Sequence, residues 1–205
     1  KYLMVGGLLL AFTLITVGLS YIDFGYWLPH LFHINLSEAG GRKANITVAL
    51  DSLEAAQAIS YEASANGVHI SVLLELDVGF KRCGIADEDE ALTLAQKISD
   101  LTNVNFKGLM FYPGHLQASA DERAQLRVAV NDLLSRVLGK LEGAGLPVQT
   151  VSGGSTPTAS ESHLFVGVNE IRPGMYIFND RNMVAVGVAE VEDCALSVIT
   201  TVVSK

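Results

Sequence analysis

The sequence predicts an α/β fold built on a parallel sheet, and three observations support this prediction. Beyond Gly41, short runs rich in Val, Ile and Leu alternate with longer segments whose apolar residues recur at helical spacing. Each helical segment separates two apolar runs, which is the pattern of βαβ units with helices outside a parallel sheet. Charged or glycine-rich loops follow the apolar runs, where such folds place their ligand sites. An α/β barrel and a doubly wound sheet both satisfy this pattern.

The regular elements follow one another with short loops between them. The sequence predicts, in order, a strand over 46–50, a helix over 53–66, a strand over 68–76, a helix over 87–101, a strand over 106–112, a helix over 120–141 and a strand over 146–151. Asp51 and Ser52 can cap the first helix, and Gly67 can end it. Three acids from Asp87 to Asp89 open the second helix at its positive end.

The two ends of the chain depart from this alternation. Residues 2–22 carry no charged side chain and are long enough to span a bilayer. They are a membrane anchor, a secretory signal peptide or buried barrel elements, and the barrel alternative is favoured because a regular α/β pattern follows. The tail is predicted to be β-rich, with apolar runs over 164–168, 176–178, 184–188 and 196–203.

These features divide the chain into three expected parts. They are an apolar segment over 1–41, an α/β portion over 42–190 and the start of a C-terminal β domain over 191–205. Nothing of low complexity marks a linker between the second part and the third.

Composition restricts the class of protein. The 205 residues carry a formal net charge of −8, which argues against a nucleic-acid surface because binding phosphate backbones needs clustered Lys and Arg. Cys83 and Cys194 lie far apart without metal-ligand spacing, so a reduced, cytoplasmic protein that handles small molecules is expected. His30 and His33 are spaced like possible metal ligands, but no carboxylate or further histidine nearby completes a site.

Two loops that follow predicted strands carry candidate functional side chains. The segment ELDVGFKRCGI, residues 75–85, ends an apolar run with acids, a glycine turn and Arg82. Arg82 therefore lies where α/β proteins bind ligands, although a solvated turn explains the local pattern equally well. In the segment FYPGHLQ, residues 111–117, Tyr112 can stack on a planar ligand and His115 can transfer protons near neutral pH.

Two later loops combine glycine with backbone or hydroxyl donors. In SGGST, residues 152–156, glycines allow backbone N–H groups to approach an anion, as in a phosphate site, although a flexible loop has the same composition. The segment IRPGMYIFND, residues 171–180, contains a Pro-Gly turn in which Gly174 allows close approach of a ligand oxygen.

In this order and at these separations, the four segments ELDVGFKRCGI, FYPGHLQ, SGGSTPT and NEIRPGMYIFND resemble the D-threonine aldolase and D-serine dehydratase family. These are pyridoxal-phosphate enzymes of the alanine racemase fold. The resemblance covers roughly residues 43–205 and implies a partial (β/α)8 barrel of TIM type, followed by the start of a β domain. It further implies a lyase that acts on D-β-hydroxy amino acids, a homodimer, and a divalent metal whose ligands lie outside this chain.

The resemblance also implies roles for individual residues. Arg82 is expected to face the pyridine nitrogen of pyridoxal 5'-phosphate, and His115 is a candidate for proton transfer. Nothing in the chain matches the family's Schiff-base lysine, so the chain by itself is expected to be inactive. A non-catalytic pyridoxal-phosphate-binding protein and a racemase-like relative are the alternatives. The other residues expected to hold the cofactor are Tyr112, Gly153, Gly154, Ser155, Thr156, Gly174, Met175 and Tyr176.

Overall fold

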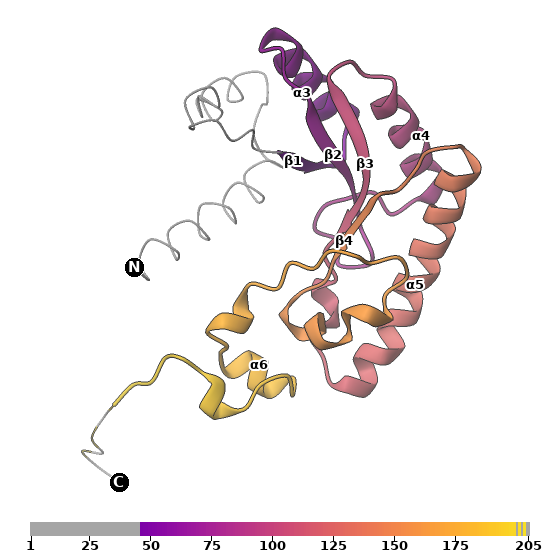
Figure 1. Cartoon of the computed structure of the whole chain (residues 1–205). Coiled ribbons are helices and arrows are strands. Elements are labelled where there is room, and N and C mark those ends of the chain that lie inside the picture. Colours follow the sequence, from indigo (N-terminus) through magenta and orange to yellow (C-terminus); the bar gives the residue numbers. More distant parts are fainter. Residues whose placement is uncertain (1–45, 200, 202, 204–205) are drawn as a thin grey trace.

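A computed structural model describes residues 46–199, 201 and 203 of the chain. The apolar segment over 2–22 and the histidines at 30 and 33 lie outside these described residues. The described part contains one parallel sheet of four strands in the order β1-β2-β3-β4 (Figure 1). The strands are β1 (Thr47–Leu50), β2 (Ile70–Leu76), β3 (Val104–Phe111) and β4 (Thr150–Gly153).

Three helices connect consecutive strands: α3 (Leu53–Ala65), α4 (Glu88–Ser99) and α5 (Ala120–Gly143). The strand order runs through the sheet without reversal, and the helices lie on one side of it (Figure 1). A doubly wound sheet has a point where the strand order reverses, so that its helices cover both faces. The structure therefore corresponds to a section of an α/β barrel, which confirms one of the two predicted architectures.

The predicted helix signals act as expected. The Ser52 hydroxyl accepts a hydrogen bond from the Ala55 amide at 3.4 Å, which caps α3. Asp87 caps α4 by accepting from the amides of Asp89 and Glu90, both at 2.9 Å. These two hydrogen bonds hold the pKa of the Asp87 carboxyl below its ordinary value. The predicted starts of both helices are confirmed.

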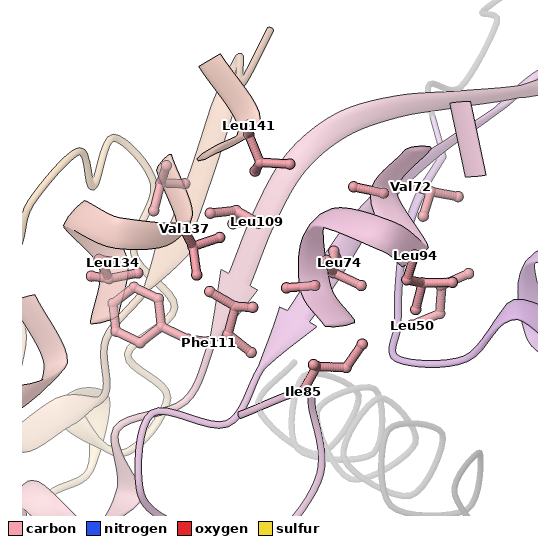
Figure 2. Close-up of a cluster of buried hydrophobic side chains, with 14 of the residues drawn as sticks. Leu50, Val72, Leu74, Ile85, Leu94, Leu109, Phe111, Leu134, Val137 and Leu141 are labelled. Carbon is pink, nitrogen blue, oxygen red and sulfur yellow. The ribbon is translucent and has the colours of Figure 1, made fainter. Parts of the chain in front are cut away.

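The hydrophobic core lies between the sheet and the three helices. Leu74 of β2 and Leu109 and Phe111 of β3 have no measurable exposure to solvent and project toward the helices (Figure 2). Leu134 and Leu141 of α5 pack against them at helical spacing. Each fully buried side chain of this kind stabilises the fold by about 1.5–3 kcal/mol relative to an exposed position. This layer fixes the strand ends that carry the candidate site.

The other face of the sheet is more polar. It contains a hollow of about 140 Å³, whose lining includes Thr47, Lys107 and Thr150. Next to Lys107, β3 and β4 come so close that a β-carbon on Gly108 would lie 2.0 Å from the Thr150 carbonyl oxygen. Gly108 also has a φ of +147°, so this position requires glycine for two reasons.

The predicted fourth strand is wrong in its boundaries. It was expected over 146–151, whereas β4 spans Thr150–Gly153. Pro147 has no amide hydrogen for the ladder, and the first bond to β3 is donated by the Gln149 amide to the Lys107 carbonyl at 2.9 Å. Leu146 instead packs against the core just before the strand begins.

The prediction of a β-rich tail is wrong for the described residues. The tail contains short helices, namely η2 (Thr156–Leu164), η3 (Met175–Ile177), α6 (Arg181–Ala185) and η4 (Val191–Asp193). Asp180 caps α6 by accepting from the amides of Asn182 and Met183, which favours helix over strand at this point. Ile199 is 99% exposed, so the last apolar run has no packing partner among the described residues. The β domain expected from residue 191 stays a prediction.

No helix in the part of the chain that the structure describes combines the length and the apolar character needed to cross a bilayer.

Candidate functional site

The carboxyl ends of β2, β3 and β4 meet at one edge of the sheet, because the three strands are parallel and adjacent. The first three segments that the sequence singled out lie at these strand ends, and the fourth follows Glu170, which forms a bridge with Ser152 of β4. A pocket lies at this edge between the ends of β2 and β3. The residues that line it are Glu75, Leu76, Asp77, Phe80, Arg82, Cys83 and Tyr112.

The loop over 77–84 has a defined hydrogen-bonded structure, in which residues 79–82 are exposed to solvent. Its two ends are joined by backbone hydrogen bonds of 3.0 Å, from Asp77 N–H to the Ile85 carbonyl and from Ile85 N–H to the Glu75 carbonyl. The Asp77 carboxylate accepts from the amides of Gly79 and Lys81, both at 2.9 Å. A β-carbon on Gly84 would lie 2.6 Å from the Asp77 nitrogen, so the loop closes only with glycine there.

Arg82 and Tyr112 lie together at the mouth of the pocket. The guanidinium carbon of Arg82 is 4.5 Å from the centre of the Tyr112 ring and 5.9 Å from the centre of the Phe80 ring. The two rings meet edge to face, with centres 5.5 Å apart. Arg82 is exposed, so this cation–π contact contributes about 0.5–1 kcal/mol. The structure therefore brings together two predicted site residues from different strands.

A carboxylate and a thiol form the inner wall of the pocket. Glu75 is only 8% exposed, and its Oε1 accepts a hydrogen bond from the Cys83 Sγ at 3.0 Å. Burial raises the pKa of the Cys83 thiol, and the Glu75 carboxylate raises it further. Sequence reasoning did not assign Glu75 to the site, although an acid inside an otherwise apolar strand was the available signal.

Four residues of the SGGST loop, Gly153 to Thr156, were predicted to hold the cofactor, and the backbone amides of two of them are available to a ligand. The Gly153 amide donates to the Glu170 carbonyl at 2.9 Å, and the Ser155 amide donates to the Thr158 hydroxyl at 2.9 Å. For the amides of Gly154 and Thr156, no acceptor is found within the described residues. Gly154 has a φ of +110°, a conformation that favours glycine. The donor set therefore suits an anion at Gly154 and Thr156.

The predicted Pro-Gly turn is an irregular segment in the structure, which leads into η3 and lies beside the SGGST loop. A parallel bridge joins Ser152 to Glu170, and a β-carbon on Gly154 would lie 3.9 Å from the Ile171 side chain. The amides of Gly174 and Met175 likewise have no acceptor in the part of the chain that is described. Tyr176, also expected to contact the cofactor, is more than half exposed on the tail. Glu170 and Ile171, at the start of this segment, thus lie beside Ser152 and Gly154 of the SGGST loop.

His115 lies behind the loop over 77–84 and does not line the pocket. It belongs to the short helix η1 (Gly114–Leu116), and its Nε2 is 3.3 Å from the position that a β-carbon of Gly79 would take. Its Nδ1 is buried without a hydrogen-bond partner among the described residues. Burial lowers the pKa of the imidazole, and Asp77 opposes this shift. In this structure His115 supports the loop.

Arg172 is a second residue that the sequence analysis missed. It precedes the Pro-Gly turn, and its guanidinium donates hydrogen bonds to the end of β3 and to β4. The motif containing it was recognised, but only the turn itself was assigned a role. A sequence pattern cannot show which carbonyl groups an arginine reaches across a fold.

Comparison with known proteins identifies relatives over this same region. The family model described as "Alanine racemase, N-terminal domain" matches residues 32–182. The D-threo-3-hydroxyaspartate dehydratase of Delftia sp. (strain HT23) is 36% identical over 173 residues, which cover 79% of this chain and 43% of the relative. The D-threonine aldolase of an Arthrobacter species is 33% identical over 141 residues, covering 68% of this chain and 37% of the relative.

Solved structures give the same result. The crystal structure of D-threonine aldolase from Filomicrobium marinum superposes with a TM-score of 0.67 at 28% identity, covering 69% of this chain and 39% of that one. The structure of the Delftia dehydratase superposes with a TM-score of 0.70 at 29% identity, covering 82% and 44%. The chain spans less than half the length of these relatives. The chain therefore belongs to the alanine racemase N-terminal domain family and forms part of the α/β barrel of that fold.

Proposed function

We propose that this chain is the cofactor-binding part of a pyridoxal-phosphate-dependent lyase that acts on D-β-hydroxy amino acids. The observation that carries the proposal is the convergence of four segments, predicted separately from the sequence, at the carboxyl edge of one sheet. The family depends on pyridoxal phosphate. The amino acids in the names of the two relatives described above share a D configuration and a β-hydroxyl group.

The phosphate group of the cofactor is proposed to bind between the SGGST loop and the Pro-Gly turn. The amides of Gly154, Thr156, Gly174 and Met175 are the donors that have no acceptor among the described residues. Backbone amides at turns and at the starts of short helices are common anion ligands, because they donate without the desolvation cost of a lysine. Gly153 and Ser155 support this loop through their bonds to Glu170 and Thr158.

The ring of the cofactor is proposed to lie near Tyr112 and Arg82. When bound, the pyridine ring supplies the electron sink for bond cleavage next to the substrate amino group. A guanidinium keeps its proton at any physiological pH and only donates hydrogen bonds. Arg82 is therefore proposed as the donor to the pyridine nitrogen, as the family resemblance implies, and Tyr112 as the aromatic neighbour of the ring.

A second candidate function is cofactor binding without catalysis. No lysine is found among the residues that line the pocket in the described part of the chain. Covalent catalysis by this family needs such an amine. The same described residues contain no group of three His, Cys, Asp or Glu side chains able to hold a metal ion. The divalent metal, the homodimer and proton transfer by His115 remain predictions.

Substrate turnover decides between the two candidates. The chain would be saturated with pyridoxal phosphate and incubated separately with D-threonine, D-serine and D-threo-3-hydroxyaspartate, with each L enantiomer as the matched control. Release of an aldehyde from D-threonine, or of ammonia from the other two, restricted to the D forms, supports the lyase. Cofactor binding without turnover supports the second candidate for this chain by itself, which is the outcome expected of a chain that lacks a matching lysine. A chain that does not bind the cofactor contradicts both.

A further inference from the structure

One hydrogen-bonded residue joins the three segments to which the cofactor is assigned. Arg172 Nε donates to the Ser152 hydroxyl at 2.9 Å, and its Nη2 donates to the Phe111 carbonyl at 2.8 Å and to the Ser152 carbonyl at 3.4 Å. Phe111 is the last residue of β3, and Ser152 belongs to β4. Arg172 itself stands immediately before Pro173 and Gly174.

Each of these partners adjoins a candidate cofactor residue. Tyr112 follows Phe111, Gly153 follows Ser152, and the Pro-Gly turn follows Arg172. A guanidinium is planar and holds its donors at fixed angles, so it can connect three backbone segments in one arrangement. A lysine has a single nitrogen on a flexible stem and cannot reproduce this geometry.

A carboxylate completes the arrangement on the far side of Ser152. The Ser152 hydroxyl donates to Glu170 Oε1 at 2.5 Å while it accepts from Arg172. Ser152 is fully buried, so both of its hydrogen bonds are shielded from competing water. The Glu170 backbone is also tied to β4, since its carbonyl accepts from the Gly153 amide at 2.9 Å and its amide donates to the Val151 carbonyl at 3.3 Å.

We propose that Arg172 is a positioning residue that fixes the Pro-Gly turn against the ends of β3 and β4. It thereby restrains the segment that leads into Gly174 and Met175 relative to β4, from which the SGGST loop continues. Part of the Arg172 side chain remains exposed, so its hydrogen bonds, and not burial, hold it in place. This inference rests on the proposed function only for the nature of the ligand, because the hydrogen bonds of Arg172 are all made to residues of the chain itself.

Hydrogen exchange of the 205-residue chain without cofactor tests the positioning directly. Mass spectrometry would compare residues 168–180 in the wild type, in Arg172→Gln and in Ser152→Ala. These residues include the amides of Glu170, Phe178 and Asn179, which are hydrogen bonded in the structure. We expect exchange to become about tenfold faster in Arg172→Gln and less so in Ser152→Ala, since hydrogen bonds from a charged donor are lost. Arg181→Gln, which removes an exposed arginine of the same tail, should change nothing.

The affinity of the Arg172 variants for pyridoxal phosphate and for pyridoxal then tests whether this positioning contributes to phosphate binding. Arg172→Gln should weaken binding of pyridoxal phosphate by about tenfold and leave binding of pyridoxal, which lacks the phosphate, unchanged. Arg172→Lys should recover only part of the loss. Equal losses for both compounds would show that Arg172 contacts the ring, and this would overturn the proposal, as would unchanged exchange in the turn.

The two proposals fail in different ways. If the wild type binds no pyridoxal phosphate, the proposed function is wrong, while the exchange data still decide the role of Arg172. If Arg172→Gln does not fold, Ser152→Ala and Arg172→Lys decide it by the same exchange criterion.

Discussion

Replacing Gly153 with alanine should destabilise the chain, because a β-carbon at this position would lie 2.2 Å from two carbons of the Phe111 ring. Carbon atoms in contact are normally about 3.5–4.0 Å apart, so the ring has to move by more than 1 Å. Phe111 has no exposure to solvent and packs against Phe165 with ring centres 5.7 Å apart. Overpacking of this kind costs about 1–3 kcal/mol, and the depth of the overlap places Gly153→Ala near the upper end.

Urea unfolding of the 205-residue chain, followed by circular dichroism, measures this cost. Gly139→Ala is the matched control, since no atom lies within 4 Å of a β-carbon there and alanine favours the interior of α5 by about 0.5–1 kcal/mol. Phe111→Leu should cost less in the Gly153→Ala background than in the wild type, because the smaller side chain relieves the overlap. An unchanged free energy of unfolding for Gly153→Ala, or additive effects of the two substitutions, would refute the packing argument.

Three further predictions concern charged and titratable groups. Arg82→Ala should weaken binding of pyridoxal phosphate by roughly 10–100-fold in calorimetry, because a hydrogen bond from a charged donor contributes about 1.5–3 kcal/mol; unchanged affinity would remove Arg82 from the site. The pKa of Cys83 is raised, so less of its thiol is present as thiolate at any given pH. In a variant without Cys194, alkylation of Cys83 at pH 8 should therefore be slower in the folded chain than in the unfolded chain. Glu75→Gln should shift the pH dependence of this alkylation rate to lower pH. Arg123→Met should lower the free energy of unfolding by about 3 kcal/mol, since the buried guanidinium pairs with Glu161 and two carbonyl groups; a loss below 1 kcal/mol in urea unfolding would contradict this.

The sequence predicted the barrel portion well because its signals are local. The cap residues Ser52 and Asp87 and the apolar periodicity of the helices specify α3 and α4 without reference to the rest of the fold. The placement of Arg82 and Tyr112 at adjacent strand ends follows from the parallel order of β2 and β3. These predictions needed only neighbouring residues and one topological rule.

The tail and parts of the site could not be predicted in this way. The apolar run over 196–203 has strand propensity but no partner strand among the described residues, and a strand forms only when it is paired. Gly153 was assigned to phosphate binding, whereas in the structure its amide is bonded to Glu170 and its missing side chain makes room for Phe111. Arg172 acts through carbonyl groups that are remote in sequence. Such long-range contacts leave no local pattern.

This edge of the sheet is proposed to bind pyridoxal phosphate through its phosphate group. Calorimetric titration of the 205-residue chain with pyridoxal phosphate, and in parallel with pyridoxal, measures this binding. We expect saturable binding at one site per chain for pyridoxal phosphate and binding weaker by at least about tenfold for pyridoxal. Absence of saturable binding, or equal affinity for the two compounds, would contradict it.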